Sequence, residues 1–433
     1  MLFRSSLATV ATLLGMRGEL DGARAHLAAA RRVFAEAGLV DQVVWCHQTE
    51  ALQLMKAGRG DDAVPLLTEV LELDQAPSTQ AAARRMLAVA YWSAGRRDDA
   101  IAQFEAALAI HARLGPPQEA ATCASGIGEL QAEQGRLGAA VERFTEAVDR
   151  YAALGAEFAP ARAAAERDLA VALAGNERPW EAAELLEQSK ATLATHGDEA
   201  GAAESGLSLA MVLAAVGEPA TAAGEAAAAA AAFERLGAVE RAAAAHHRAA
   251  EFLDRLDRDD EAIAHYQAAQ DGYGAAGNDL DAAGARARKG TLLGVVGRGE
   301  EGLAEIDAAA ATFAAADELF ALGRCHDQAG RVLAGLGRID DAVHRCGAGI
   351  ACFEQIGFGI GVAELHLLTG RVLASAGRLD EAVGRLRQAL SIFERLRLNE
   401  DAMTCHGVLA DVLTELGRHE EAAAHARALD DLA

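Results

Sequence analysis

The sequence predicts an all-α protein, an α-solenoid of about 11 helical hairpins (about 22 helices) that forms a right-handed superhelix, and three observations lead to this fold class. A turn motif recurs along the whole chain of 433 residues, and small residues recur at fixed distances on both sides of it. The composition is 52% apolar but only 4% aromatic, with many Ala and Leu residues, which favours close-packed helices over sheets.

The turn motif is clearest at residues 376–382, which read Ala-Gly-Arg-Leu-Asp-Glu-Ala. Gly377 can adopt the left-handed conformation that ends a helix, because it has no Cβ atom. Asp380 and Glu381 place negative charge on the first turn of a following helix, and Leu379 suits a hydrophobic contact at its start. We therefore expect this stretch to connect two helices.

Eleven copies of the turn can be aligned, and nine of them have Gly at the position of Gly377. The steps between copies are 40 residues, apart from one step of 37 and one of 42 residues. Such self-similarity indicates a repeat protein rather than a set of globular domains. The aligned turn positions are Gly18, Gly58, Gly95, Gly135, Glu177, Gly217, Asp257, Gly297, Gly337, Gly377 and Gly417.

Small residues also recur around each turn. Ala382 follows Gly377 by five residues and Gly370 precedes it by seven, and the equivalent residues in other copies are again Ala or Gly. Small residues at fixed spacing indicate that two helices cross closely. A larger residue recurs near the end of the second helix and is expected to fill the space between hairpins. Its copies are Phe34, His111, Tyr151, Leu193, Phe233, Tyr273, Phe313, Phe353 and Phe393.

The period is irregular at two places. Residues 74–80 form a shortened connection that contains Pro77, and residues 155–160 carry two extra residues. Both are candidate bends. With these exceptions, we expect residues 1–433 to form a single solenoid of about 11 repeats, in which each repeat contacts only its neighbours.

This arrangement of small, small and aromatic positions around an interhelical Gly resembles the tetratricopeptide repeat, in its longer form of about 40 residues. The resemblance covers the whole chain, although the Trp early in the first helix and the Pro at the repeat end that are usual in that family are lacking. It implies a scaffold that binds ligands along a concave face lined by the first helix of each repeat. The repeats are also similar to the repeat regions of bacterial regulators, especially actinobacterial ones.

Register from the turns places two patches on the face that the resemblance implies. An apolar patch includes two of the three tryptophans, which either anchor a ligand or are partly buried against the next repeat. A basic patch either attracts an anionic partner or forms salt bridges to nearby carboxylates, such as Glu251, Asp327 and Glu364. The apolar candidates are Trp45, Leu52, Met55, Val89 and Trp92, and the basic candidates are Arg248, Arg288, Arg324, Arg331 and Arg371.

No metal site, cofactor or catalytic activity is expected. His47, His246, His326, His366 and His406 occupy one repeat-equivalent position, so successive copies should lie about 8 to 10 Å apart, too far to share a zinc ion. The sequence contains no HExxH, GxSxG or P-loop pattern. The six cysteines form no CxxC pair and are expected to be reduced thiols of a cytoplasmic protein.

The charge balance narrows the class of partner. A net charge of −24 opposes a broad role on nucleic acid or on an anionic membrane, because those surfaces repel it. No apolar run reaches the length of a membrane span. The expected partner is therefore a protein or peptide, with an acidic segment where it meets the arginines.

The first helix, at residues 1–16, is apolar on most sides and has no acidic residue. A terminal repeat needs a polar outer face, so Leu2 and Phe3 are candidates for an interface with a second copy of the chain or with another domain. In the alternative, these side chains fold back on the second helix around Leu27 and Phe34.

The leading functional hypothesis is a non-enzymatic scaffold for protein–protein interaction, which binds a partner segment in the concave groove. The alternative is a sensor or regulatory repeat domain of a bacterial signalling or transcription regulator, which binds a peptide or a small ligand.

Overall fold

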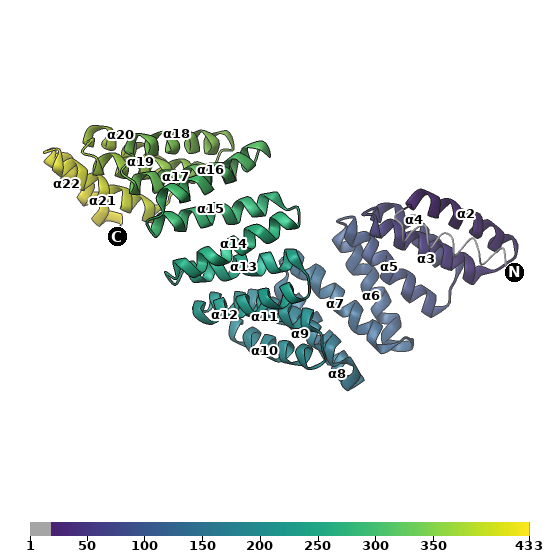
Figure 1. The fold of residues 1–433 in the computed structure, drawn as a ribbon. Coiled ribbons are helices and arrows are strands. Elements are labelled where there is room, and N and C mark those ends of the chain that lie inside the picture. The colour runs from purple at the N-terminus through teal and green to yellow at the C-terminus, as the bar shows by residue number, and fades with distance from the viewer. Residues whose placement is uncertain (1–18, 433) are drawn as a thin grey trace. The chain divides into compact units, whose positions relative to one another are not determined.

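The computed structural model describes residues 19–432, and within them it contains 21 α-helices, one 3-10 helix and no strand. Within each of the two compact units of the chain, consecutive helices pack against each other as hairpins (Figure 1). The predicted all-α solenoid of helical hairpins is therefore confirmed. The predicted helix at residues 1–16, with the proposed interface residues Leu2 and Phe3, lies outside the described residues.

The chain divides into two compact units, Met1–Val216 and Gly217–Ala433, which are described separately. The described part of unit 1 begins with the second helix of a repeat. From there, the first and second helices of successive repeats alternate along the unit. Its helices are α2 (Leu20–Glu36), α3 (Val40–Lys56), α4 (Gly60–Leu73), α5 (Pro77–Ser93), α6 (Arg97–Leu114), α7 (Pro117–Glu133), α8 (Leu137–Leu154), η1 (Ala156–Phe158), α9 (Ala159–Gly175), α10 (Pro179–Thr195) and α11 (Glu199–Ala215).

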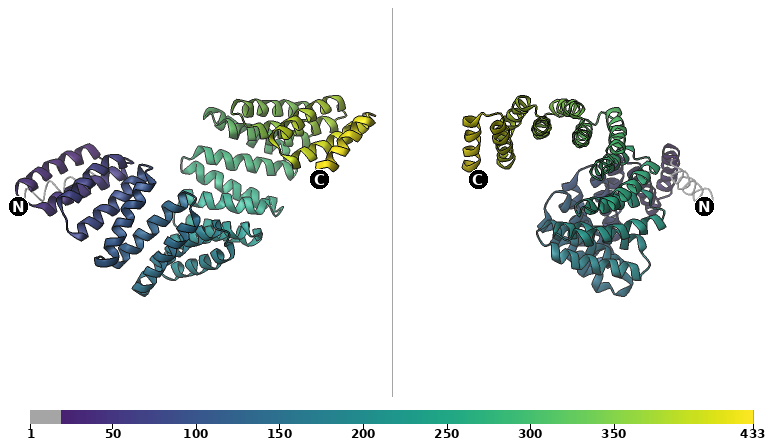
Figure 2. Two further views of the ribbon diagram at one scale, coloured as in Figure 1. Left: turned by 180° about the vertical axis from the view of Figure 1, so that it is seen from behind. Right: turned by 60° about the vertical axis from the view of Figure 1, so that its left-hand side comes forward.

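Unit 2 continues the same alternation, and Figure 2 shows its green to yellow helices following one another in sequence order. None of the helices in residues 19–432 is both long and apolar enough to cross a lipid bilayer. The helices of unit 2 are α12 (Pro219–Arg235), α13 (Val239–Asp254), α14 (Asp259–Ala275), α15 (Asp279–Val295), α16 (Gly299–Ala315), α17 (Leu319–Gly335), α18 (Ile339–Gln355), α19 (Gly359–Ser375), α20 (Leu379–Leu396), α21 (Asn399–Glu415) and α22 (His419–Leu432).

The predicted turns have the expected geometry. All ten turn positions among residues 19–432 have positive φ, including Glu177 at 61° and Asp257 at 54°. At the reference copy, the Gly377 N–H donates to the Ala374 carbonyl and the Arg378 N–H donates to the Leu373 carbonyl, both at 2.9 Å. This pair of bonds is the Schellman motif, which satisfies carbonyl groups that a helix end leaves unpaired.

The same turn also recurs between repeats, which the sequence analysis missed. Its positive-φ residues are Gly in five copies, but Asp317 has φ of 58° and Arg397 has φ of 60°. The second helix of one repeat therefore ends as the first helix does. Since most helices have 17 residues, the 40-residue unit consists of two nearly equal helix-and-turn halves.

Three connections in unit 1 lack this turn. Asp74 is extended after α4, and η1 follows Gly155 after α8, so two of these connections lie where the repeat period is irregular. The third was not predicted: Gly115, after α6, has φ of −100° and ψ of −179°, and Pro116 continues the extended chain.

The residue after the turn Gly is often Arg, and this Arg links the helix ends. Arg378 pairs with Glu381 of its own helix at 2.7 Å and with Asp340 of the preceding repeat at 2.6 Å. Arg338 pairs in the same way with Asp341 and Glu300. Each exposed pair contributes little on its own, about 0 to 1 kcal/mol. Their common effect is to align the turns of adjacent repeats along one edge.

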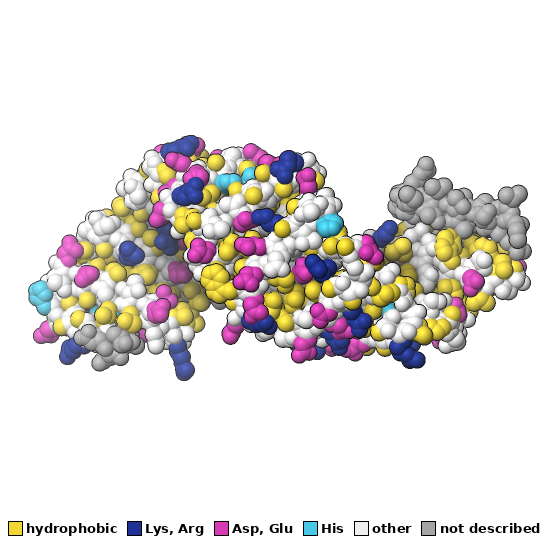
Figure 3. All heavy atoms as spheres, turned by 90° about the horizontal axis from the view of Figure 1, so that it is seen from below, with side chains coloured by type: hydrophobic (Ala, Val, Ile, Leu, Met, Phe, Trp, Pro, Cys, Tyr) yellow, Lys and Arg dark blue, Asp and Glu magenta, His cyan; other side chains and the backbone are white. Residues whose placement is uncertain are grey.

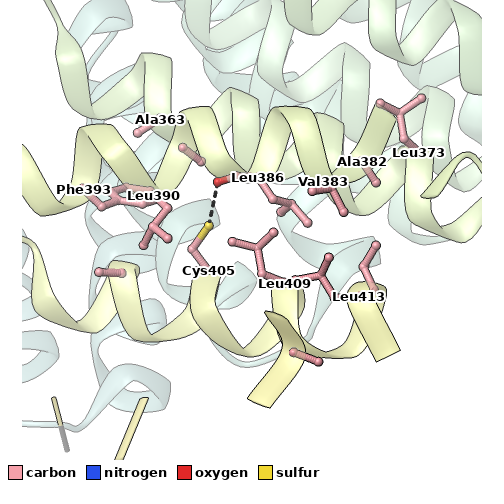
Figure 4. Close-up of a cluster of buried hydrophobic side chains, with 14 residues drawn as sticks. Ala363, Leu373, Ala382, Val383, Leu386, Leu390, Phe393, Cys405, Leu409 and Leu413 are labelled. Carbon is pink, nitrogen blue, oxygen red and sulfur yellow. Dashed lines mark hydrogen bonds between the residues drawn. The ribbon is translucent and has the colours of Figure 1, made fainter. Parts of the chain in front are cut away.

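Small residues lie where the helices cross, as predicted. A Cβ atom at Gly302 of α16 would lie 2.3 Å from the backbone oxygen of Gly290 in α15, so the two backbones touch. Around these crossings, large side chains fill the layers, as Figure 4 shows for α19, α20 and α21. There Phe393 and Leu386 are fully buried, and the Cys405 thiol donates to the Leu386 carbonyl at 3.1 Å.

The first prediction concerns the left-handed turn residues. Replacing Glu177 by Gly should raise the free energy of unfolding by about 1 kcal/mol, because an L-residue pays a steric cost in this conformation that Gly avoids. The measurement is the midpoint of urea unfolding. As a control, Gly337→Ala should lower the midpoint. If both substitutions shifted it in the same direction, the left-handed residue would not limit stability.

The second prediction concerns the helix crossings. Gly302→Ala should cost about 1 to 3 kcal/mol, because the added methyl group overpacks the contact with α15. Gly384 of α20 is a matched control, since it is exposed and no atom lies within 4 Å of its Cβ position. Gly384→Ala should therefore stabilise the chain by about 1 kcal/mol through helix propensity. Calorimetric unfolding measures the stability of both variants. If both substitutions changed it equally, the close contact between α15 and α16 at Gly302 would be refuted.

Candidate functional site

The first helices of adjacent repeats contact each other directly in unit 1, where α3 packs on α5, α7 on α9, and α9 on α11. The residue six positions before each turn projects from this row, and in four of the five helices it is a large apolar residue. Val171 is 53% exposed, and Leu52, Val89 and Met211 are exposed as well. The row therefore presents apolar side chains to solvent where the resemblance implies a binding face.

A pocket of about 320 Å³ lies in this row, between α5, α7, α8 and α9. Trp92 forms one wall, and its indole N–H donates to Glu133 at 3.0 Å. Arg97 binds the other oxygen of Glu133 at 2.8 Å, which fixes the carboxylate beside the ring. The lining residues are Trp92, Glu129, Ala132, Glu133, Leu137, Phe144, Asp168, Val171 and Ala172.

Two carboxyl groups in the pocket are in an unfavourable environment for charge. Burial, together with repulsion from Asp168 and Glu133, raises the pKa of Glu129 to about 7. Burial also raises the pKa of Asp168, although Arg167 lies 3.3 Å from its carboxylate. A cationic or hydrogen-bond-donating group in the pocket would stabilise both carboxylates.

Only one of the five predicted apolar residues lines this pocket. Trp92 lines it, whereas Trp45 and Leu52 are 40% and 45% exposed on α3 and Val89 is exposed on α5. Met55 is partly buried against the core near Leu54. The sequence analysis missed Glu129, Asp168 and Val171. Glu129 and Val171 occupy the same register position as Leu52 and Val89, so the register contained a signal for them.

The predicted basic patch in unit 2 is largely neutralised by its own carboxylates. Arg248 pairs with Glu251 at 2.7 Å, Arg288 with Asp254 at 3.2 Å, and Arg331 with Asp327 at 3.0 Å. Arg324 lies 3.8 Å from Asp327 and 3.9 Å from Glu364. The salt-bridge alternative therefore describes four of the five arginines. Arg371 is exposed and has no ion pair among residues 19–432.

The charge of Glu251 illustrates this neutralisation. Burial alone would raise its pKa, but hydrogen bonds from His247 and Arg248 lower the pKa to about 2. Glu251 therefore stays ionised and holds Arg248. Figure 3 shows charges of both signs dispersed among hydrophobic side chains on the face that it presents.

Three of the five histidines that share one repeat position, His246, His326 and His406, have hydrogen-bond partners within their own hairpins. Nδ1 of His246 lies 2.8 Å from Nδ1 of His265, and His406 and His425 repeat this geometry at 2.8 Å. His326 contacts Arg345 in the same register. Burial and the neighbouring His246 lower the pKa of His265, so the neutral form of His265 is favoured. No group of three or more potential metal ligands occurs in residues 19–432.

The six cysteines are free thiols, and five of them are buried. Burial raises the pKa of Cys405 to about 12, and that of Cys123 likewise. These thiols therefore stay protonated at neutral pH and are poor nucleophiles.

Comparison with protein families supports the repeat type. Residues 78–153 and 361–429 match the family model described as "Tetratricopeptide repeat". These segments cover most of α5–α8 in unit 1 and of α19–α22 in unit 2, so the resemblance is confirmed for part of each unit. A search of curated proteins found no significant match. Similarity to actinobacterial regulators stays a prediction.

Comparison with solved structures supports the fold. The apo form of RapI is 10% identical with a TM-score of 0.58, and the match covers 82% of this chain and 99% of RapI. The apo form of the quorum sensor NprR from B. thuringiensis is 12% identical with a TM-score of 0.50, covering 92% of this chain and 99% of NprR. At these identities the similarity establishes the arrangement of helices alone.

The third prediction concerns Glu129. Its pKa in the folded state, about 7, lies above its ordinary value, so ionisation between pH 5 and pH 8 lowers folding stability. Glu129→Gln removes this titration. The free energy of unfolding of the variant should therefore exceed that of the wild type by more at pH 8 than at pH 5. Urea unfolding at both pH values measures the difference. Glu142→Gln, at an exposed position of α8, is the control. A pH-independent effect of Glu129→Gln would contradict the pKa assignment.

Proposed function

We propose that this protein is a non-enzymatic scaffold that binds a segment of a partner protein along the row of first helices in unit 1. The observation that carries the proposal is the pocket beside Trp92, because it combines a half-buried tryptophan with apolar walls on a face that also exposes Val171 and Met211. Tryptophan in a partly enclosed pocket is the residue type that most often dominates a protein interface.

The partner segment is proposed to carry a basic residue beside an apolar one. Asp168 lies close enough to Glu129 to raise the pKa of Glu129, and a lysine or arginine side chain between them would relieve that repulsion. The ring of Trp92 adds a surface on which a cation is attracted. The net charge of −24 attracts a basic segment over a longer range as well.

In unit 2, we propose a weaker and separate contact with an acidic group. Arg371 is the arginine of the predicted patch that is exposed without an ion pair in the described part of the chain. Binding at the other four would require an incoming carboxylate to compete with an internal one, and such an exchange yields little free energy.

The second candidate function is a sensor or regulatory domain that binds a peptide or small ligand. Its support is the overall similarity to NprR, a quorum sensor, over 92% of this chain. A regulator must bind its ligand more tightly in one conformation than in another, whereas a scaffold need not. Small-angle X-ray scattering with and without a bound peptide distinguishes the two, since only the sensor is expected to change its dimensions.

The fourth prediction tests the binding face. Peptides selected from a random displayed library against the full chain should be enriched in Lys or Arg next to an apolar residue. In isothermal titration calorimetry, Trp92→Ala should weaken their binding at least roughly tenfold, as expected for a central aromatic contact. Glu129→Lys should weaken it further at low salt.

Trp180 supplies the matched control for this experiment. It is 60% exposed on the second helix α10 and does not line the pocket. Trp180→Ala should leave the affinity unchanged. The proposal fails if Trp180→Ala weakens binding as much as Trp92→Ala, or if the selected peptides lack basic residues.

A further inference from the structure

A second pocket in unit 1 shares no residue with the one beside Trp92. It has a volume of about 290 Å³ and lies between the N-terminal half of α5, the C-terminal end of α6 and the first turn of α7. Its walls are mostly apolar, and its polar residues are Ser78, Arg85, His111 and Glu119. The apolar wall consists of Pro77, Ala81, Ala82, Ile110, Leu114 and Pro116.

The pocket lies where a large aromatic residue is missing. His111 occupies the position that Phe233, Phe353 and Phe393 hold in other repeats, where each ring is at most 1% exposed and fills the space between hairpins. An imidazole is smaller than a phenyl ring. The connection after α6 also lacks the left-handed turn. Gly115 and Pro116 are extended there, so the chain does not reverse as tightly before α7 as in other connections. Both departures occur at the same place, and together they leave the space unfilled.

His111 is a buried polar side chain without a hydrogen-bond partner among the described residues. It is only 7% exposed, and neither of its ring nitrogens has a hydrogen-bond partner in the described part of the chain. Gly115 leaves room for the ring, because a Cβ atom at this position would clash with Nδ1 of His111. Burial lowers the pKa of His111, so the ring is neutral and offers one donor and one acceptor. An unpaired buried group of this kind is unfavourable unless a ligand supplies its partner.

The charged residues of the pocket are already matched. Arg85 lies 3.1 Å from Glu119, and the pair spans from α5 to α7 at the pocket wall. A charged ligand would have to displace one member of this pair, whereas a neutral ligand would not. The imidazole of His111 is therefore the uncharged buried group that remains available to a ligand, since both of its nitrogens lack a hydrogen-bond partner in the described residues.

We propose that this pocket is a binding site for a small neutral molecule with an apolar body and one hydroxyl group, which pairs with the imidazole of His111. The apolar walls enclose the body of the ligand, and the hydroxyl group can donate to the ring acceptor or accept from the ring N–H. A volume of about 290 Å³ suits a single substituted ring rather than a peptide. The site is independent of the proposed protein-binding face.

The fifth prediction uses 4-fluorophenol and fluorobenzene as probes for the full-length chain, in a titration followed by ¹⁹F NMR. The phenol should bind at least about tenfold more tightly than fluorobenzene, because fluorobenzene leaves the imidazole unpaired. His111→Phe should abolish binding of the phenol and raise the midpoint of thermal unfolding, since the phenyl ring fills the space.

Two further variants make the test decisive. Ala82→Leu should block the pocket and abolish binding without changing His111, which keeps the test valid if His111→Phe does not fold. His196→Gln, at the exposed end of α10, should leave binding unchanged. The proposal is overturned if neither probe binds, if fluorobenzene binds as tightly as the phenol, or if binding survives Ala82→Leu.

Discussion

The left-handed residue that ends most of the helices is the constraint on which the rest of this structure depends. A Schellman turn at Gly377, Gly337 or Gly417 closes one helix, and the next residue is already the first carbonyl acceptor of the following helix. The connection is therefore only three residues long, so consecutive helices must pack side by side. Because most helices have 17 residues, equivalent side chains return to the same face in every repeat. The geometry tolerates Glu177, Asp257 and Arg397 at this position, although each pays the steric cost of positive φ.

Packing follows from this repeating connection. Helices that are held so close can cross only where both carry small residues, and Gly290 and Gly302 show the limit, with backbone against backbone. The space left between hairpins is then constant, and a phenyl ring such as that of Phe393 fills it. Where the connection changes, after α6, the filling residue changes too, and His111 borders a pocket. Irregularity in the turn and a binding-sized pocket thus have one structural origin.

The two units use the same face differently. In unit 1 the row of first helices exposes apolar side chains and crowds Glu129 against Asp168, so that charge there is unfavourable. In unit 2 the equivalent positions carry Glu251, Arg331 and Arg371, and most charges are matched internally. A surface with unsatisfied groups has more to gain from a partner than one whose charges are paired. This difference favours unit 1 as the binding surface.

The sequence by itself determined the helical repeat, the ten described turns and the small residues at the crossings, because each depends on local backbone geometry and on spacing along the chain. It also determined the register that places Trp92 on the first-helix row. Only the tertiary structure decided which residues meet across helices. The repulsion between Glu129 and Asp168, the proximity of Arg324 to Glu364 and the unpartnered ring of His111 all depend on side chains from different helices. Spacing along the chain places a residue on a face, but it does not reveal whether a carboxylate or open space lies opposite, since that depends on packing between helices.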